Sequence, residues 1–355
     1  MKVKRAKVPE GELKMKPDEN ALGFGKYFTD HMLTMAYDRK SGWGAPEVKG
    51  YQPFSLDPAA MALHYGQAIF EGLKAYRGKN DEIFLFRPED NLRRMNDSAT
   101  RMCMPTLPVP EVLSAMKSLL DLDRSWVPSS PGATLYIRPT MIATEAALGV
   151  RPAGEYLFFV IMSPVGAYYP EGFNPVKIYV TEDYVRAAPG GVGHVKTAGN
   201  YAASIMAALE AKKKGYTQVL WLDAIKRRYI EEIGTSNIFF SINGELVTPA
   251  LSGSILPGIT RDSVIRLAGE WGIKVTERAV AIDEVIDALA DGSLQEIFAS
   301  GTAAVISPVG ALHYRGREYP INDEKTGPLA QRFFDEIQAI QFGDRPDPFG
   351  WRVRL

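Results

Sequence analysis

The sequence predicts a mixed α/β fold of the α+β kind, arranged in two domains. The chain has 355 residues, about the length of two ordinary domains. Apolar residues make up 46% of it and charged residues 23%, so a hydrophobic core can form. Segments with helical and strand periodicity alternate, but without the regular strand–helix–strand repeat of a doubly wound sheet.

The first predicted domain covers residues 1–165. Residues 1–20 are charged and lack periodicity, so we expect an extended arm there. The apolar run 83–86 predicts a buried strand, and Pro88 followed by an acidic turn predicts the start of a helix. Periodicity predicts the other elements, a helix over 111–122 and strands over 134–138 and 156–162.

A stretch rich in turn-forming residues, 166–176, predicts the linker to a second, larger domain over 177–355. In that domain Asn243-Gly244 separates two apolar runs and predicts a hairpin. Thr260 is the expected N-cap of a helix that reaches Trp271. The remaining expected elements are strands over 177–181, 218–222 and 295–299 and helices over 199–214, 283–290 and 328–342.

Composition excludes several classes of function. Lys and Arg total 41 against 42 Asp and Glu, so there is no electrostatic reason to expect nucleic acid as a partner. The single Cys103 cannot form an intrachain disulfide, and the four histidines lack the spacing of a metal site. No apolar run is long enough to span a bilayer, and the N-terminus resembles no ordinary targeting signal. We therefore expect a cytoplasmic enzyme without a metal.

Lys196 follows a glycine-rich stretch that begins at Gly190 and invites comparison with phosphate-binding loops. The spacing differs from a nucleotide-binding P-loop, because Val195 stands where that loop has glycine. A solvent-exposed lysine is the ordinary explanation of such a position.

Three further clusters have both a chemical and a structural explanation. Glu231 and Glu232 lead into a predicted buried strand, where a carboxylate can pair with a buried cation or simply face water at the strand end. The helix start at Ile259 and Thr260 offers backbone N–H groups to an anion, although most helix starts bind nothing. The small-residue turn 300–304 suits a ligand contact or a tight packing corner.

The order and spacing of these motifs resemble those of the class IV aminotransferases, which are fold-type-IV enzymes that use pyridoxal 5'-phosphate. The fuller set is similar to branched-chain amino acid aminotransferases, from about Phe54 to the C-terminus. The resemblance implies two α/β domains with the active site at their interface. It rests on the motifs His64-Tyr65-Gly66, Ile69-Phe70-Glu71-Gly72, Arg94 to Ala99, Tyr136-Ile137-Arg138-Pro139, Gly166-Ala167-Tyr168, Lys196 to Tyr201, Glu232, Asn237 to Phe239, Leu256 to Arg261 and Ser300 to Ala303.

The resemblance assigns the cofactor-binding residues. Lys196 corresponds to the catalytic lysine, since only a lysine amine can both form the Schiff base and shuttle the proton. Glu232 corresponds to the carboxylate that keeps the ring nitrogen protonated, and Glu231 is expected to point the other way along the strand. The other assignments are Arg94, Ile259, Thr260 and Thr302 for the phosphate, Tyr201 for O3′ and Thr235 for the carboxylate side of the ring; Arg186 is a lesser candidate.

The resemblance also assigns substrate residues and a partner. Phe70, Tyr136 and Tyr168 would enclose an aliphatic side chain, and the N–H groups of Thr302 and Ala303 would meet the α-carboxylate. Arg138, Tyr65 and Tyr168 are candidates for the second carboxylate of glutamate. In this family the residue at Tyr65 comes from the neighbouring subunit, which implies a homodimer.

Together these implications predict reversible amino transfer between L-leucine, L-isoleucine or L-valine and 2-oxoglutarate, which gives branched-chain 2-oxo acids and L-glutamate. The nearest alternative is another fold-type-IV enzyme, a D-amino-acid aminotransferase or an aminodeoxychorismate lyase. The motif around Arg138 and the length of the chain argue against both. A phosphate-binding or NTPase module around Gly191 to Thr197 and an inactive scaffold are the alternatives from other classes.

Overall fold

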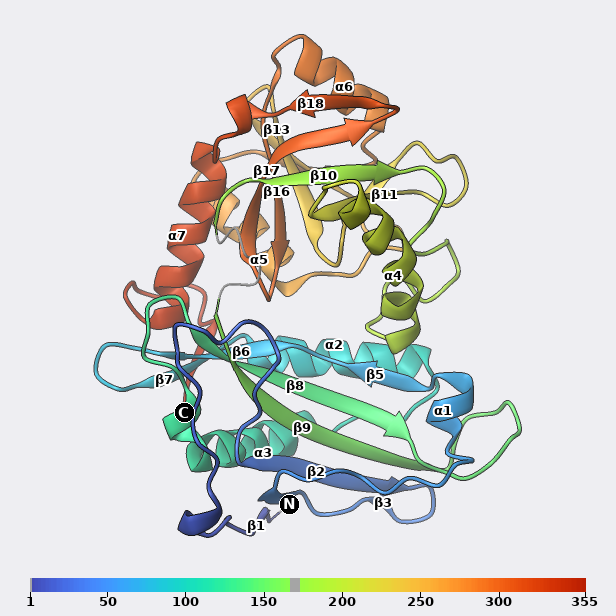
Figure 1. Cartoon of the computed structure of the whole chain (residues 1–355), viewed down its shortest axis with the longest axis vertical. Coiled ribbons are helices and arrows are strands. Elements are labelled where there is room, and N and C mark those ends of the chain that lie inside the picture. The colour runs from blue at the N-terminus through green and yellow to red at the C-terminus, as the bar shows by residue number, and fades with distance from the viewer. Residues whose placement is uncertain (1, 167–172) are drawn as a thin grey trace. The chain divides into compact units, whose positions relative to one another are not determined.

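The computed structural model describes residues 2–166 and 173–355. Contacts divide the chain into two compact units, each with its own sheet (Figure 1). The first comprises 1–168, 195–198 and 339–355, and the second comprises 169–194 and 199–338. The units therefore differ from the predicted domains at 195–198 and 339–355, and the predicted boundaries stay a prediction. In the described residues, no helix combines the length and apolar character of a membrane span.

The sheet of the first unit is antiparallel except at β1 and β4, which pair in parallel. Its two longest strands, β8 and β9, alternate between buried and partly exposed residues over much of their length. The strand order is β1 (Lys4–Arg5), β4 (Glu47–Gly50), β2 (His31–Asp38), β9 (Glu155–Val165), β8 (Thr134–Ala143), β6 (Leu73–Arg77), β7 (Ile83–Phe86) and β19 (Arg352–Arg354), with β3 (Gly42–Trp43) on β2 and β5 (Ala68–Phe70) on β8.

Helices of the first unit share a core with one face of this sheet. Leu92, Met95 and Ala99, at helical spacing, are fully buried with Leu135 and Ile137 of β8. Tyr136 and Arg138 alternate with those two strand residues and therefore belong to the opposite face. The helices are α1 (Met61–Tyr65), α2 (Pro88–Arg101) and α3 (Val109–Leu122), with short 3-10 helices at Glu10–Glu12 and Arg124–Trp126.

The sheet of the second unit is mixed. β10 pairs in parallel with both neighbours and β14 with β15, whereas the other pairs are antiparallel. The strand order is β12 (Ile230–Ile233), β11 (Gln218–Leu222), β10 (Val176–Thr181), β17 (Val305–Tyr314), β16 (Leu294–Gly301), β13 (Asn237–Ile242), β14 (Glu245–Pro249) and β15 (Val275–Arg278), with β18 (Arg317–Pro320) on β17. The remaining helices are α4 (Ala198–Lys213), α5 (Ile259–Glu270), α6 (Ile282–Ala290) and α7 (Pro328–Phe342), with a 3-10 helix at Asn322–Glu324.

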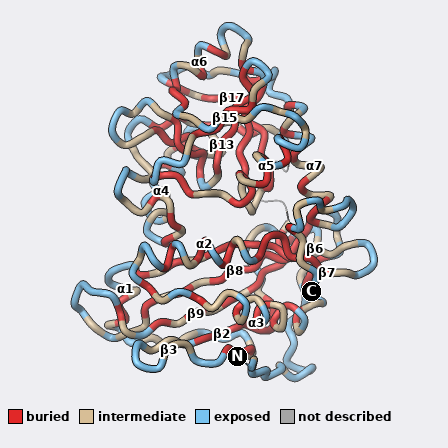
Figure 2. Tube along the Cα trace, turned by 180° about the vertical axis from the view of Figure 1, so that it is seen from behind, coloured by how far each residue is buried: buried red, intermediate tan, exposed pale blue. Residues whose placement is uncertain are grey.

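Both sheets have buried central strands, and β13 is buried along its whole length (Figure 2). The mixed α/β class is therefore confirmed, as are the strand 83–86, the helix 328–342 and the hairpin at Asn243-Gly244. Both hairpin residues have positive φ, 52° and 76°, as this turn requires.

The predicted N-cap at Thr260 is wrong. The helix α5 begins at Ile259, so Gly258 is the N-cap and Thr260 already lies inside the helix. A residue with helical backbone angles in the first turn cannot also cap that turn. A side chain added at Gly258 would overlap Asn237 Oδ1, so glycine is needed there for close packing.

Candidate functional site

The backbone of Lys196 is held on two sides within the first unit. Its carbonyl accepts a hydrogen bond of 3.0 Å from the N–H of Phe70, next to a bridge between Ile69 and Thr197. Its own N–H donates to Ser98 Oγ at 2.9 Å, on helix α2. The segment 195–198 therefore lies against β5 and α2, which fixes where the lysine side chain begins.

The Lys196 side chain is half-buried and lies among charged and aromatic groups. Its Nζ is 4.9 Å from the centre of the Phe70 ring. Burial lowers the pKa of Lys196 to about 8; the Glu71 carboxylate opposes this change, while the Arg94 guanidinium adds to it. An amine with such a pKa is neutral in a useful fraction of molecules near neutral pH, as a nucleophile or general base must be.

Arg94 forms a buried, bidentate ion pair with Glu71. The Nε and Nη2 atoms of Arg94 donate to the two oxygens of Glu71 at 2.7 and 2.9 Å. The N–H of Gly72 adds a bond of 3.1 Å to the same carboxylate. The motif assignments leave Glu71 without a role, although a glutamate between two apolar strand segments is a signal for a buried charge pair.

An aromatic wall with one cation lies on the sheet face of Tyr136. The guanidinium carbon of Arg138 is 4.6 Å from the centre of the Phe70 ring, and its Nη2 donates to the Tyr136 hydroxyl at 3.0 Å. Phe24 packs edge-on against the Tyr136 ring at 4.9 Å, a contact that periodicity could not reveal because Phe24 lies in an irregular segment. A side chain added at Gly72 would overlap the Tyr136 hydroxyl oxygen. The wall therefore leaves no room for a larger residue at that position.

The first unit thus brings several predicted site residues together around one amine. Phe70 contacts the Lys196 side chain directly, and the charges of Arg94, Tyr136 and Arg138 act on its pKa. Glu71, which the motifs left unassigned, belongs to the same group.

Two predicted substrate residues do not join this cluster in the described structure. Tyr65 is 38% exposed, and its hydroxyl donates to the carbonyl of Leu148. Tyr168 lies outside the described residues.

Glu232 is the centre of the polar cluster in the second unit. Its carboxylate accepts bonds from Asn237 Nδ2 at 3.1 Å and from the N–H of Leu256 at 3.0 Å, and it forms an ion pair with Arg186. Arg186 itself donates to the Gly193 carbonyl at 3.0 Å. Glu231 is also buried, and it accepts a bond from Ser254. The carboxylate of Glu232 is therefore fixed in position by donors on several sides.

The other predicted residues of the second unit lie at element ends. Ile259 and Thr260 form the first turn of α5, at a helix start with no side-chain cap. Thr302 and Ala303 follow directly after β16 and are half-buried, as is Tyr201 in the first turn of α4. Thr235 is exposed in the turn between β12 and β13. Helix starts and strand ends of this kind present backbone N–H groups that can bind an anion.

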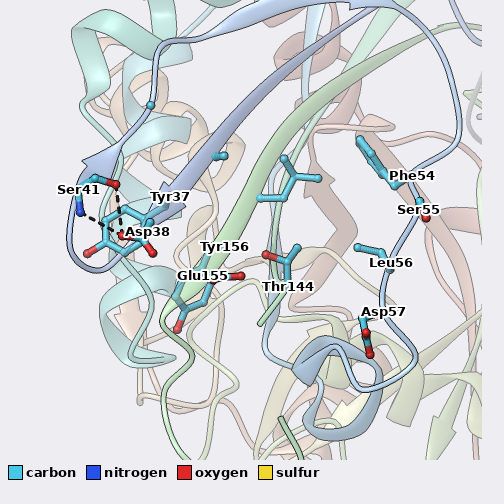
Figure 3. Close-up of a pocket in the computed structure, with 14 residues that line it drawn as sticks. Tyr37, Asp38, Ser41, Phe54, Ser55, Leu56, Asp57, Thr144, Glu155 and Tyr156 are labelled. Carbon is cyan, nitrogen blue, oxygen red and sulfur yellow. Dashed lines mark hydrogen bonds between the residues drawn. The ribbon is translucent and has the colours of Figure 1, made fainter. Parts of the chain in front are cut away.

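A hollow of about 470 Å³ lies elsewhere in the first unit and is lined by Tyr37, Asp38, Phe54, Asp57 and Glu155, among others (Figure 3). None of the predicted site residues lines it. Asp38 caps its own turn through Ser41, as the dashed lines in Figure 3 show. In the described part of the chain, no group of three or more His, Cys, Asp and Glu side chains could hold a metal ion.

Comparison with known families identifies the chain's relatives. The profile of the amino-transferase class IV family matches residues 68–312, which is more than half of the chain. The chain belongs to the class IV aminotransferases. The resemblance predicted from the motifs is thereby confirmed, and the nucleotide-binding and inactive-scaffold alternatives lose their support.

Individual class IV aminotransferases match along nearly their whole length. "Branched-chain-amino-acid aminotransferase 2" of Bacillus subtilis is 54% identical over 96% of this chain and 94% of its own. "Probable branched-chain-amino-acid aminotransferase" of Staphylococcus aureus is 52% identical over 96% and 95%.

Solved structures of class IV aminotransferases have the same fold. The Escherichia coli branched-chain amino acid aminotransferase superposes with a TM-score of 0.73 at 28% identity, over 91% of this chain and 98% of that one. The T.th. branched-chain amino acid aminotransferase with pyridoxamine 5'-phosphate gives 0.75 at 28% identity, over 90% and 97%. These relatives favour the branched-chain prediction over a D-amino-acid aminotransferase or aminodeoxychorismate lyase.

Proposed function

We propose that this class IV aminotransferase transfers the amino group between L-leucine, L-isoleucine or L-valine and 2-oxoglutarate, with pyridoxal 5'-phosphate attached to Lys196. The observation that carries the proposal is the half-buried Lys196 amine, whose pKa is lowered by burial and is influenced by the charges of Glu71 and Arg94. The 54% identity to a branched-chain relative supports the substrate class.

The residues present fit this cofactor. It is an anion with an aldehyde and a basic ring nitrogen, and the chain offers a half-buried amine, a guanidinium and a fixed carboxylate. When bound, the cofactor supplies an electron sink for the bonds at the substrate α-carbon. We propose that Arg94, the first N–H groups of α5 at Ile259 and Thr260, and the Thr302 hydroxyl hold the phosphate.

The protein's own groups would then manage protons and charge. Lys196 Nζ takes the proton from the substrate α-carbon and returns it on the other side of the reaction. Glu232 would keep a proton on the ring nitrogen, and its contacts with Asn237, Leu256 and Arg186 support this role because they fix the carboxylate in position. Tyr201 would donate to O3′, and Thr235 would support the same side of the ring.

Substrate binding is proposed to use the aromatic wall. Phe70, Tyr136 and Tyr168 enclose the aliphatic side chain, while the N–H groups of Thr302 and Ala303 bind the α-carboxylate. The contact between Arg138 and the Tyr136 hydroxyl places a cation beside the aromatic wall. This supports Arg138 as a group that could bind the second carboxylate of the substrate. The candidates for the distal carboxylate of 2-oxoglutarate are therefore Arg138, Tyr65 and Tyr168.

We further propose a cytoplasmic homodimer. Around Tyr65, the side chains of Leu63, Leu148 and Val150 are 62%, 68% and 85% exposed, an apolar surface that a second copy would cover. A single cysteine, which forms no intrachain disulfide, agrees with the cytoplasm. Sedimentation equilibrium should give twice the chain mass, and a fully active monomer would contradict the proposed role of Tyr65.

The decisive experiment follows the colour of the purified protein. We expect yellow protein that bleaches with L-leucine and regains its colour with 2-oxoglutarate. D-alanine in the same assay should leave the colour unchanged, which separates this function from a D-amino-acid aminotransferase. Lys196→Ala should bind the cofactor only non-covalently. Wild-type protein that stays colourless after addition of pyridoxal phosphate would rule out the proposal.

A further inference from the structure

Glu71 is the buried carboxylate nearest in sequence to the aromatic wall, and none of the roles assigned above uses it. Its side chain is 0% exposed, and protein donors bind both oxygens, Arg94 on each of them and Gly72 on one. Its own N–H donates to the Pro139 carbonyl at 2.8 Å, which fixes its backbone to β8. The position of this charge is therefore set from both the backbone and the side chain.

The charge of this one carboxylate acts on two cations, the buried Arg94 and the half-buried Lys196. The charged or titratable groups that act on Lys196 are Glu71, Arg94, Tyr136 and Arg138. The charges of Arg94 and Arg138 lower the pKa of Lys196, whereas the charge of Glu71 raises it. Because Glu71 also forms the ion pair with Arg94, its charge acts on Arg94 and Lys196 at once.

The bidentate geometry of the Arg94–Glu71 pair matters for the proposed phosphate contact. A guanidinium is planar and can donate two hydrogen bonds to one carboxylate along its Nε–Nη2 edge, which fixes its orientation. An arginine held this way loses little further freedom when it meets an anion. A lone Arg94 side chain in the same place would have to be ordered by the ligand itself.

We propose that Glu71 is a positioning residue of the amino-transfer site, which fixes the Arg94 guanidinium for an anionic group and supplies a counter-charge to Lys196. This inference rests on the proposed function. It assigns two separable effects to one carboxylate: orientation, through Arg94, and charge, through Lys196.

The test compares two aldehydes with the cofactor-free full chain, pyridoxal and pyridoxal phosphate. Neutral Lys196 Nζ adds to the aldehyde carbon of either, and a carbon–nitrogen double bond forms as water leaves. Only pyridoxal phosphate carries the anion that Arg94 would bind. The absorbance change on capture gives a pH midpoint for pyridoxal and a dissociation constant for pyridoxal phosphate.

Glu71→Gln should separate the two effects. Loss of the negative charge should lower the pH midpoint of pyridoxal capture by about one unit or more. Below the midpoint, about ten times more Lys196 would then be neutral, so the rate of capture should rise about tenfold. The same variant should bind pyridoxal phosphate at least about tenfold more weakly, because Arg94 is no longer oriented. Opposite changes with the two aldehydes are not expected from simple destabilisation.

Two further variants complete the experiment. Glu71→Asp keeps the charge but shortens the side chain, so the midpoint should stay near that of the wild type while pyridoxal phosphate binds more weakly. This variant carries the test if Glu71→Gln does not fold. Asp123→Asn is the matched control, since Asp123 is a buried carboxylate of the same unit paired with His31, and it is not among the charges that act on Lys196.

The outcomes distinguish this inference from the function on which it rests. Wild-type protein that captures neither aldehyde contradicts the proposed function itself. If the wild type captures both and the Glu71 variants match it in midpoint and affinity, only the role of Glu71 is overturned. A midpoint shift of equal size in Asp123→Asn would also overturn it.

Discussion

Two buried arginine–glutamate pairs, one in each unit, have the same chemistry but different surroundings. In the first unit, Arg94 meets both oxygens of Glu71 beside the Lys196 amine. In the second, Arg186 meets one oxygen of Glu232, and Asn237 and a backbone N–H take the other. In the proposed mechanism the arginine contacts the cofactor in the first pair and the glutamate does so in the second. An ion pair by itself therefore does not tell which partner is functional; its neighbours do.

The largest expected effect concerns Lys196, which belongs to the same unit as the first pair. Lys196→Ala should lower the rate of amino transfer by about four orders of magnitude, since it removes both the covalent attachment and the proton carrier. Stopped-flow absorbance with L-leucine measures the loss. Lys79→Ala, an exposed lysine of the same unit, is the control and should leave the rate unchanged. Comparable losses in both variants would show that the loss is not specific to Lys196.

Removing one arginine from each pair should separate their roles. Arg94→Met and Arg186→Met each leave a buried carboxylate without its cation and should lower the free energy of unfolding by about 3–5 kcal/mol. Arg94→Met should also lose affinity for pyridoxal phosphate, whereas Arg186→Met should mainly lower the rate of the chemical step. Urea unfolding and cofactor titration measure the two effects.

The pair between exposed Arg151 and half-buried Glu145 is the control for these variants. Its Arg151→Met change should cost much less stability than either buried arginine, because solvent screens the charges. If Arg186→Met weakened cofactor binding as much as Arg94→Met does, the proposal that the arginine contacts the cofactor in the first pair and the glutamate in the second would be wrong.

The charge balance around the first pair predicts a pH dependence of stability in the cofactor-free protein. Burial lowers the pKa of Lys196 from 10.5 to about 8, so between these values the unfolded chain binds more protons than the folded one. Stability should therefore rise with pH across this window. Lys196→Met should be more stable than the wild type at pH 7 by up to about 3 kcal/mol, and the difference should vanish near pH 10.5.

Thermal unfolding at several pH values tests this prediction. The exposed Lys79→Met variant should show no such gain at about pH 7. A gain that persists unchanged at pH 10.5 would mean that the ammonium charge is not its source.

The smallest effects are expected at two glycines, one beside each region. Gly72→Ala would crowd the Tyr136 hydroxyl, and Gly258→Ala would crowd the side-chain oxygen of Asn237. Overpacking of this kind costs about 1–3 kcal/mol. Gly72→Ala should raise KM for L-leucine, while Gly258→Ala should lower kcat through the carboxylate that Asn237 holds. Steady-state kinetics would refute the contrast if both variants changed KM alone.

The sequence by itself determined the class of fold, most of the elements and the family. Periodicity placed the helix 328–342 and the strand 83–86 at the observed residues, because the spacing of apolar side chains is a local property. The order of the motifs around Lys196 and Glu232 identified the class IV aminotransferases. The N-cap prediction at Thr260 is wrong because close packing of Gly258 on Asn237 starts the helix earlier.

Only the tertiary structure decided the partners of the charges. Arg94 and Glu71 are 23 residues apart in sequence, and the Lys196 N–H reaches Ser98 across 98 residues, so no local pattern pairs them. The lowered pKa of Lys196 likewise requires burial by segments distant in the chain. A sequence shows which ionisable groups exist; their desolvation and their counter-charges arise when the chain packs, and these set what each group can do.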